Sequence, residues 1–372
     1  MNNPAARMTF SPVRSRADWL IRWAGAAALA CGLGALAVAP AQAQVQIRIQ
    51  SGVVAAPGAP ASVANPAGEM SERELAAWLA RLREASRGRS FQGVFVVSST
   101  AGALSSSRIW HVCDGQQQME RVDALTGVPR TTLRRDDQVL TFFPTVKLAR
   151  SERLESPGLF PELLRPGNNA IASYYSARRI GGDRVAGLEA DGVELMPRDL
   201  MRFGYRIWSE HQTGLVVKLQ TLDAATGQVL EQAAFSELLL DAPVSMDKLA
   251  QMMNATAGYR VETPALVRTT AESQGWAIAS PVPGYRPMNC YLRGSEAVLQ
   301  CIFSDGLASV SVFVEPWDAK RHAQEGVRRL GATQTLTRRL VDRSGAAWWI
   351  TTVGEAPLRT LAAFSQAPER RP

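Results

Sequence analysis

Arg202-Phe203-Gly204-Tyr205-Arg206-Ile207-Trp208 stands near the middle of the chain and alternates between two kinds of side chain. One set comprises Phe203, Tyr205 and Ile207, and the other comprises Arg202, Gly204, Arg206 and Trp208. In an extended chain, alternate residues point to opposite faces, so the first set shares one apolar face. This period of two predicts a β-strand with one buried side.

Turn-forming sequences lie on both sides of this strand. Residues 181–187, 210–214 and 225–228 contain Gly with polar neighbours, and residues 215–219 and 231–235 read as further extended segments. Short turns between such segments predict an antiparallel meander. A sheet with one apolar face needs a helix or a bound ligand to cover that face.

The N-terminal segment has the three parts of a secretory signal. Residues 1–22 carry four Arg and one Asp, residues 23–39 carry no charge, and Ala41-Gln42-Ala43 has small residues two apart. We predict a signal peptide over residues 1–43, with cleavage after Ala43 and export of the chain. A retained membrane anchor is the alternative, because about 17 apolar residues is the lower limit for a span. A lipoprotein signal at Cys31 is disfavoured, because Ala stands where Leu is expected three positions earlier.

Length and charge set limits on the exported product. Removal of the signal from the 372-residue chain would leave 329 residues, which is enough for two domains. The signal holds +3 of the formal net charge of +7, so about +4 would remain. This mild charge, spread over scattered Arg, argues against nucleic-acid binding. Residues 44–69 are rich in Ala, Pro and Gly with hardly a charge, and we expect a flexible leader there.

Three of the four cysteines lie beyond the signal. If Ser295-Glu296 forms a two-residue hairpin loop, the strands on either side place Cys290 opposite Cys301. Because exported proteins meet an oxidising compartment, we predict a cross-strand disulfide between them. The alternative is two buried thiols. Cys113 is left over, and we interpret it as a small core side chain.

The first domain is expected to open with a helix and continue as a sheet. Ser71-Glu72-Arg73-Glu74 has the form of a capping box, and Leu75, Trp78, Leu79 and Leu82 follow at helical spacing. This single apolar stripe suits a helix that covers a sheet. A membrane-surface helix is disfavoured because its polar face mixes acids with Arg.

From Phe91 onward the apolar period changes to two. Turn residues separate the expected strands, which are residues 91–97, 108–113, 117–122, 129–134, 139–143 and 146–151. A short helical piece is expected over residues 159–164. The first domain is therefore a long antiparallel sheet with one or two covering helices, over residues 70–242.

A linker of residues 243–270 follows, with low order expected from residue 258 on. The second domain spans residues 271–366. Its first strands form a meander through the Cys290 hairpin and the Asp305-Gly306 turn. Further expected elements are a helix over residues 318–329, strands over residues 332–340 and 346–353, and a helix over residues 358–364 with Pro357 at its first position.

No group of residues indicates catalysis or metal binding. His111, His211 and His322 are not spaced to share a metal ion, and Cys-x-x-Cys and Gly-x-Ser-x-Gly sequences are absent. We expect no catalytic residue, metal or cofactor, and the sequence gives no positive evidence for an enzyme.

Basic charge is dense around the central strand. The arginines concerned are Arg178, Arg179, Arg184, Arg198, Arg202 and Arg206. One interpretation is a basic face that meets lipid phosphates or an acidic segment of a partner. The other is the solvent side of a half-buried sheet.

Several motifs resemble the MucB/RseB family of periplasmic regulators of the envelope-stress (sigma-E type) response. In the first domain the matching motifs are Phe91-Gln92-Gly93-Val94-Phe95, Asp183-Arg184-Val185-Ala186-Gly187, Pro197-Arg198-Asp199, Arg202 to Trp208, Thr213-Gly214-Leu215 and Glu231-Gln232. In the second domain, residues 304–313 form the most specific motif. The resemblance covers residues 72–355 in order. It departs at Arg130-Thr131-Thr132, where the family usually has an acid after the Arg.

The resemblance implies an α+β fold. The N-terminal domain would be an unclosed antiparallel β-barrel covered by helices, as in lipoprotein carriers, and a smaller C-terminal α/β domain would follow. The resemblance further implies that the chain binds the periplasmic part of a membrane-spanning anti-sigma factor, shields it from site-1 proteolysis, and is released by lipid, including lipopolysaccharide. The resemblance also implies a periplasmic location. Assembly into a homo-oligomer is possible, and the sequence does not decide it.

Candidate binding residues follow from this fold. We expect acyl chains on the concave apolar face, at Phe91, Phe95, Trp110, Phe142, Phe203, Tyr205 and Ile207. Ordinary core packing is the alternative for each. Partner contact would use the second domain and the Arg-bearing sheet, with Arg202 and Arg206 as candidates. The alternative function is a periplasmic lipid or lipoprotein carrier without a regulatory role. The motif at residues 304–313 favours the regulator, because a carrier needs only the sheet.

Overall fold

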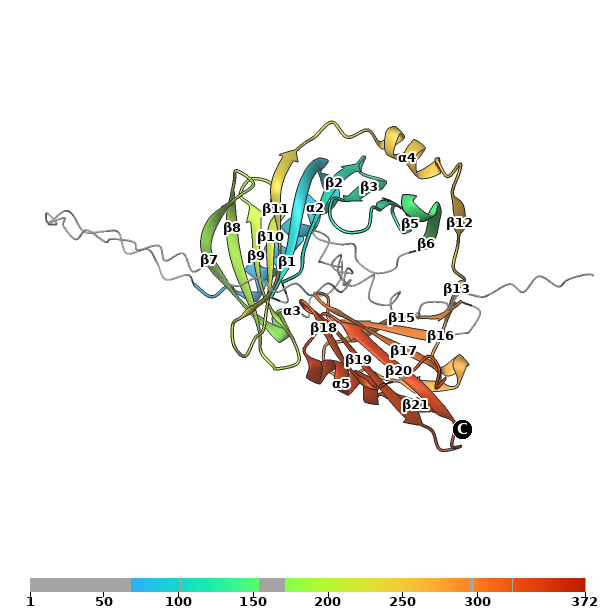
Figure 1. Cartoon of the computed structure of the whole chain (residues 1–372). Coiled ribbons are helices and arrows are strands. Elements are labelled where there is room, and N and C mark those ends of the chain that lie inside the picture. The colour runs from blue at the N-terminus through green and yellow to red at the C-terminus, as the bar shows by residue number, and fades with distance from the viewer. Residues whose placement is uncertain (1–67, 101, 154–170, 295–297, 323, 372) are drawn as a thin grey trace, which may run out of the picture.

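The computed structural model describes residues 68–100, 102–153, 171–294, 298–322 and 324–371, and these form two domains built on separate sheets (Figure 1). The predicted signal peptide, nearly all of the leader, the helix over residues 159–164 and the loop at Ser295-Glu296 lie outside the described residues. The predicted fold class is confirmed: an unclosed, mostly antiparallel sheet with helices is followed by a smaller domain with its own sheet.

The first domain contains one 12-stranded sheet. Its elements in chain order are α2 (Glu72–Gly88), β1 (Phe91–Ser99), β2 (Leu104–Cys113), β3 (Gln118–Ala124), β4 (Thr131–Arg135), β5 (Gln138–Phe143), β6 (Leu148–Arg153), α3 (Ile171–Tyr174), β7 (Tyr175–Val185), β8 (Leu188–Pro197), β9 (Gly204–Glu210), β10 (Val216–Leu222), β11 (Val229–Leu240), α4 (Met246–Asn254) and β12 (Arg260–Glu262). A 3₁₀ turn at Pro144–Val146 joins β5 to β6.

Two meanders make up this sheet. Strands β1 to β6 form one, β7 to β11 form the other, and antiparallel pairing of β1 with β11 joins them. The sheet curls, with α2 inside the curve and α4 on its outer side (Figure 1). One pair departs from the antiparallel pattern, because β12 runs parallel to β6 at the sheet edge.

Helix α2 forms where the capping box predicts it. The Ser71 side chain accepts a hydrogen bond from the Glu74 N–H, and the Glu74 carboxylate accepts one from the Ser71 N–H at 2.8 Å. Two N–H groups without helical partners are thereby satisfied. The apolar stripe of the helix, from Leu75 to Leu82, is buried against the inner face of the sheet.

The second domain contains a 7-stranded antiparallel sheet in the order β13-β15-β16-β17-β20-β19-β18. Its elements are β13 (Leu266–Thr269), a 3₁₀ turn (Glu272–Gln274), β14 (Trp276–Ile278), β15 (Arg286–Arg293), β16 (Val298–Ser304), β17 (Ser309–Pro316), β18 (Gly326–Leu330), β19 (Thr333–Val341), β20 (Ala347–Gly354), α5 (Leu358–Gln366) and β21 (Pro368–Arg370). Helix α5 packs Leu361 and Phe364 onto the sheet, and Pro357 is its N-cap residue rather than its first helical residue.

Two expectations from the sequence are wrong. The segment of low order expected from residue 258 on contains β12 and β13, because the crossing chain adds an edge strand to each sheet. The helix expected over residues 318–329 is a single turn, closed by the His322 N–H donating to the Asp318 carbonyl, followed by β18. Gly331, with φ of 60°, permits the tight turn that returns β18 onto β19.

Candidate functional site

The inner face of the first domain gathers most of the predicted lipid-binding residues. Phe91, Phe95, Phe203, Tyr205 and Ile207 all belong to one apolar cluster, and none is more than 6% exposed. Phe235 joins them, with its ring edge-on to Phe91 and to Phe95. The same cluster contains the buried stripe of α2. The helix therefore already occupies the apolar hollow.

Trp110 and Phe142 lie on the opposite face of the sheet. In β2, His111 pairs with Phe91 and so faces inward, which turns its neighbour Trp110 outward. The Arg121 guanidinium lies 4.8 Å from the Trp110 ring centre. Phe142 is buried under α4, with Tyr259 edge-on at 5.0 Å. The structure thus divides the predicted lipid-binding set between two faces.

Arg202 is buried between the two domains. Its side chain is fully enclosed, and its Nε donates a hydrogen bond to Asp305 Oδ2 of the second domain at 3.0 Å. Its Nη1 and Nη2 atoms donate to the Asp199 carboxylate and to the Pro283 carbonyl. A buried guanidinium is tolerable only when paired in this way. We call Arg202, Asp305 and the residues in contact with them the interdomain junction.

Aromatic rings and a close backbone approach complete the interdomain junction. The Arg202 guanidinium lies 4.3 Å from the Tyr174 ring centre and 5.2 Å from that of Tyr285. Gly284, with φ of 88°, has no room for a side chain, because a Cβ there would lie 2.5 Å from Arg202 Nη2. Burial raises the pKa of Tyr175 well above its usual value, so its hydroxyl stays protonated and donates to Asp305 Oδ2 at 3.3 Å.

Asp305 is fixed from its own side as well. Its Oδ1 accepts hydrogen bonds from the N–H groups of Leu307 and Ala308 at 3.0 and 2.8 Å, which holds the predicted turn between β16 and β17. One carboxylate oxygen therefore organises the second-domain turn while the other binds the first domain. The Leu307 side chain packs on the first-domain cluster, and Met201 packs in return on the second-domain core.

Arg206 lies on the outer face of the sheet, away from Arg202. Together with Arg178 it clamps the buried carboxylate of Glu194, at 2.8 and 2.6 Å. Burial alone would raise the pKa of Glu194, but the hydrogen bonds from these two guanidiniums outweigh it and lower the pKa overall. Arg206 and Arg202 therefore do not share the exposed basic face that the sequence suggested. The Arg206 side chain is about one-third exposed.

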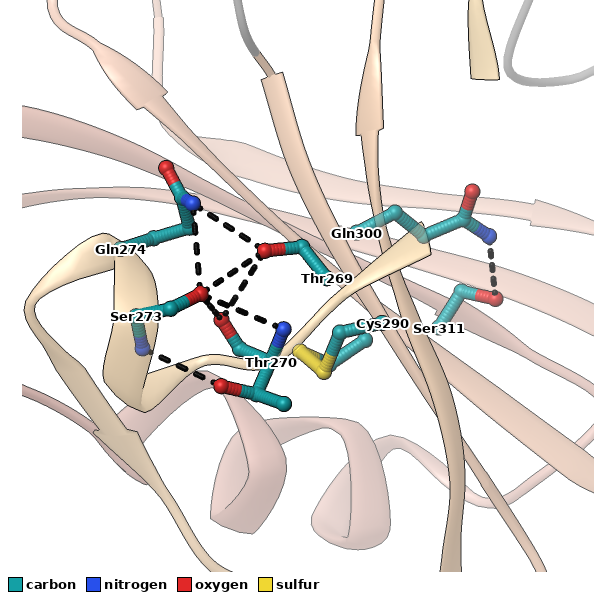
Figure 2. Close-up of a disulfide and its surroundings, with 8 residues drawn as sticks. Thr269, Thr270, Ser273, Gln274, Cys290, Gln300 and Ser311 are labelled. Atoms are coloured by element: carbon teal, nitrogen blue, oxygen red, sulfur yellow. Dashed lines mark hydrogen bonds between the residues drawn. A yellow bond between two sulfur atoms is a disulfide. The ribbon is translucent and has the colours of Figure 1, made fainter. Parts of the chain in front are cut away.

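The predicted disulfide between Cys290 and Cys301 is present and joins β15 to β16 (Figure 2). Beside it, Thr269, Thr270, Ser273 and Gln274 form a hydrogen-bonded turn that connects β13 to the domain (Figure 2). Cys113 is the free cysteine of the described chain. The disulfide therefore links two strands of the second-domain sheet close to β13, where the linker enters this domain.

Replacement of both bridged cysteines by Ala is expected to lower the free energy of unfolding by about 3 kcal/mol. The bridge closes a sequence separation of 11, and loop-closure entropy of that size gives about this value. Urea titration of the oxidised protein and of the double variant measures it. Cys113→Ser serves as the control and should change little. Equal midpoints for the double variant and the parent would contradict the prediction.

In the parts of the chain that the structure describes, no group of three or more His, Cys, Asp or Glu side chains is arranged to hold a metal ion. Nor does any described helix have the length and apolar character needed to cross a bilayer.

Comparison with known proteins assigns the two domains. Residues 74–253 match the MucB/RseB N-terminal domain, and residues 270–369 match the MucB/RseB C-terminal domain. The chain belongs to the MucB/RseB family. The first match ends within α4, and the segment between the two matches carries β12 and β13.

Two relatives and two crystal structures match about four-fifths of this chain and about nine-tenths or more of their own length. The Pseudomonas aeruginosa protein named sigma factor AlgU regulatory protein MucB is 32% identical over 302 residues, which cover 78% of this chain and 90% of the relative. The sigma-E factor regulatory protein RseB of Escherichia coli is 23% identical over 305 residues, which cover 78% and 89%. A crystal structure of MucB in complex with MucA(peri) is 29% identical, covers 80% of this chain and 99% of that chain, and has a TM-score of 0.61. A crystal structure of MucB is 27% identical, covers 80% of this chain and 98% of that chain, and has a TM-score of 0.57.

Proposed function

We propose that this chain is a periplasmic regulatory protein that binds the periplasmic region of a membrane-spanning anti-sigma factor. The observation that carries the proposal is the match of both MucB/RseB domains in order, joined by a likeness over 80% of the chain to MucB in complex with MucA(peri). This chain therefore carries both domains that the family uses, held together by the interdomain junction. Such a protein acts by binding alone and needs no catalytic residue.

The bound protein would shield the anti-sigma factor from site-1 proteolysis, and lipid or lipopolysaccharide would release it. Release requires two mutually exclusive bound states, with lipid favouring the one that cannot hold the partner. A coupling free energy of about 1–3 kcal/mol changes the partner affinity about 5- to 150-fold. An acyl chain could bind the apolar inner face at Phe91, Phe95 and their neighbours. It would have to displace α2, which covers these residues.

The partner contacts would use the second domain and the outer face of the first. Arg206 offers a partly exposed guanidinium on that outer face. Arg202 contributes differently, since it is buried and fixes the position of the second domain relative to the first. The partner site therefore depends on the interdomain junction even if no junction residue touches the partner.

Titration of the purified protein against the immobilised periplasmic region of the anti-sigma factor tests this proposal. We expect saturable binding, and a loss of affinity within the range given above when lipopolysaccharide is added. The matched control is the same polysaccharide with its acyl chains removed, which should have no effect. Binding that lipopolysaccharide leaves unchanged would remove the release mechanism, and lipid binding without partner binding would identify a carrier.

A further inference from the structure

A carboxylate of the first domain touches the turn between β18 and β19 of the second. Glu231, in β11, accepts a hydrogen bond at Oε2 from the Ala332 N–H at 3.4 Å. A Cβ on Gly331 would lie 2.2 Å from the same oxygen, so the turn and the carboxylate are in close contact. Ala332 is fully buried and belongs to the apolar cluster of the first domain. This turn is therefore a second point at which the domains meet.

A second carboxyl group comes to the same place from the second domain. Glu355 follows β20 directly, and Gly354, the last residue of that strand, pairs with Gln334 near the start of β19. Glu355 thus lies beside the turn that Glu231 touches. Within the described chain, neither carboxylate forms an ion pair with a basic side chain.

Among the described residues, two groups of the first domain interact electrostatically with Glu355, and neither carries a positive charge. They are the carboxylate of Glu231 on β11 and the phenol of Tyr205 on β9. Burial raises the pKa of Tyr205 well above its usual value, so this phenol stays neutral. Burial and the charge of Glu231 raise the pKa of Glu355 to about 7, and burial raises the pKa of Glu231 as well. Both residues are half-buried, and neighbouring carboxylates repel each other when both are ionised.

We propose that Glu231 and Glu355 form a proton-dependent latch between the two domains. With a proton on one carboxyl group, the turn between β18 and β19 stays seated on the first domain. With both groups ionised, their repulsion and their hydration favour separation of the turn from that domain. This latch is independent of which partner the chain binds.

The direction of the pH effect follows from linkage. The pKa of Glu355 in the closed arrangement lies above its ordinary value of 4.5, so closure is favoured at low pH. That contribution is lost as the pH rises through about 7. Between pH 4.5 and about 7, the ratio of open to closed protein can rise up to about 10-fold for each pH unit, and above that range it levels off.

Distance measurement between spin labels on the two domains tests the latch. Leu104→Cys and Val327→Cys provide exposed attachment sites, at 63% and 42% exposure, in the whole chain with Cys31 and Cys113 replaced by Ser. We expect one short distance at pH 6, and a longer distance whose share relative to the short one rises about 10-fold by pH 8. Identical distance distributions at the two pH values would overturn the proposal.

Two variants and a control test whether the pH response of this distance depends on Glu231 and Glu355. Glu355→Gln and Glu231→Gln should each keep the short distance at both pH values, because each removes one of the two charges. Glu369→Gln, an exposed acid of β21, should keep the pH response of the parent protein. A pH response that persists in both latch variants would also overturn the proposal. Because these variants alter different domains, loss of folding in one leaves the other to decide.

Discussion

Replacement of Arg202 by Met is expected to lower the free energy of unfolding by about 3–5 kcal/mol. The substitution keeps the apolar stem but leaves Asp305, whose side chain is 1% exposed, as a buried carboxylate that has lost its cation. The Pro283 carbonyl loses its hydrogen-bond donor at the same time. Because separation of the domains would let water reach Asp305, we also expect the two domains to unfold at different urea concentrations.

A double-mutant cycle separates the pair from its surroundings. Asp305→Asn keeps the oxygen that accepts from Leu307 and Ala308 but removes the charge, so the turn should survive. With Met at 202 and Asn at 305 together, we expect the loss to be smaller than the sum of the single losses by at least about 1 kcal/mol, because no unpaired charge remains buried. Urea titration, followed by tryptophan fluorescence and by circular dichroism, measures all four proteins.

Arg206→Met is the matched control for this cycle. Arg206 also pairs with a buried carboxylate, but Glu194 keeps Arg178 at 2.6 Å when Arg206 is removed. Its side chain is also 34% exposed, and pairs of that kind contribute about 1 kcal/mol or less. If Arg202→Met unfolded at the same urea concentration as the control, the interdomain pair would contribute little to stability.

The individual strands and the disulfide are predictable from the sequence because their signals are local. Apolar residues alternate within each strand, and Gly with polar neighbours marks the turns between strands. The pairing of Cys290 with Cys301 follows from counting outward from a single short loop, and the structure confirms it. Where local signals are weak, as in β12 and β13, pairing with distant strands decides the structure.

The composition of the inner face is not predictable in the same way. Alternation shows that Trp110 and His111 point to opposite faces, but not which of them faces inward. That choice depends on the register of β1 with β2, in which Phe91 pairs with His111. The register of neighbouring strands thus separates Trp110 and Phe142 from the other aromatic residues, although all of them are large and apolar.

The contact between Arg202 and Asp305 has no local signal at all. The two residues lie 103 positions apart and belong to different domains. The sequence pattern places Arg202 on the polar side of a strand, whereas β9 begins only at Gly204. The only shared feature is that each lies in one of the most distinctive motifs of its domain. The structure shows what the two motifs have in common, because together they fix how the domains meet.

The hollow of the first domain raises the question of how lipid could enter it. Leu82 of α2 is 1% exposed and packs in the same cluster as Phe91 and Tyr205. If an acyl chain binds there, it must displace this helix, since both need the same apolar surface. The free energy that seats α2 therefore opposes lipid binding, and any loss of it should appear as a gain in lipid affinity.

Leu82→Ala is accordingly expected to act in opposite directions on stability and on lipid affinity. Removal of a buried Leu side chain lowers the free energy of unfolding by about 2–5 kcal/mol. Binding of a fluorescent fatty acid should become at least about 5-fold tighter, because the helix then competes less well for the inner face. Glu84→Ala, an exposed change on the same helix, should alter neither quantity. A variant that lost stability without gaining affinity would show that acyl chains do not replace α2, and would remove the inner face as the lipid site.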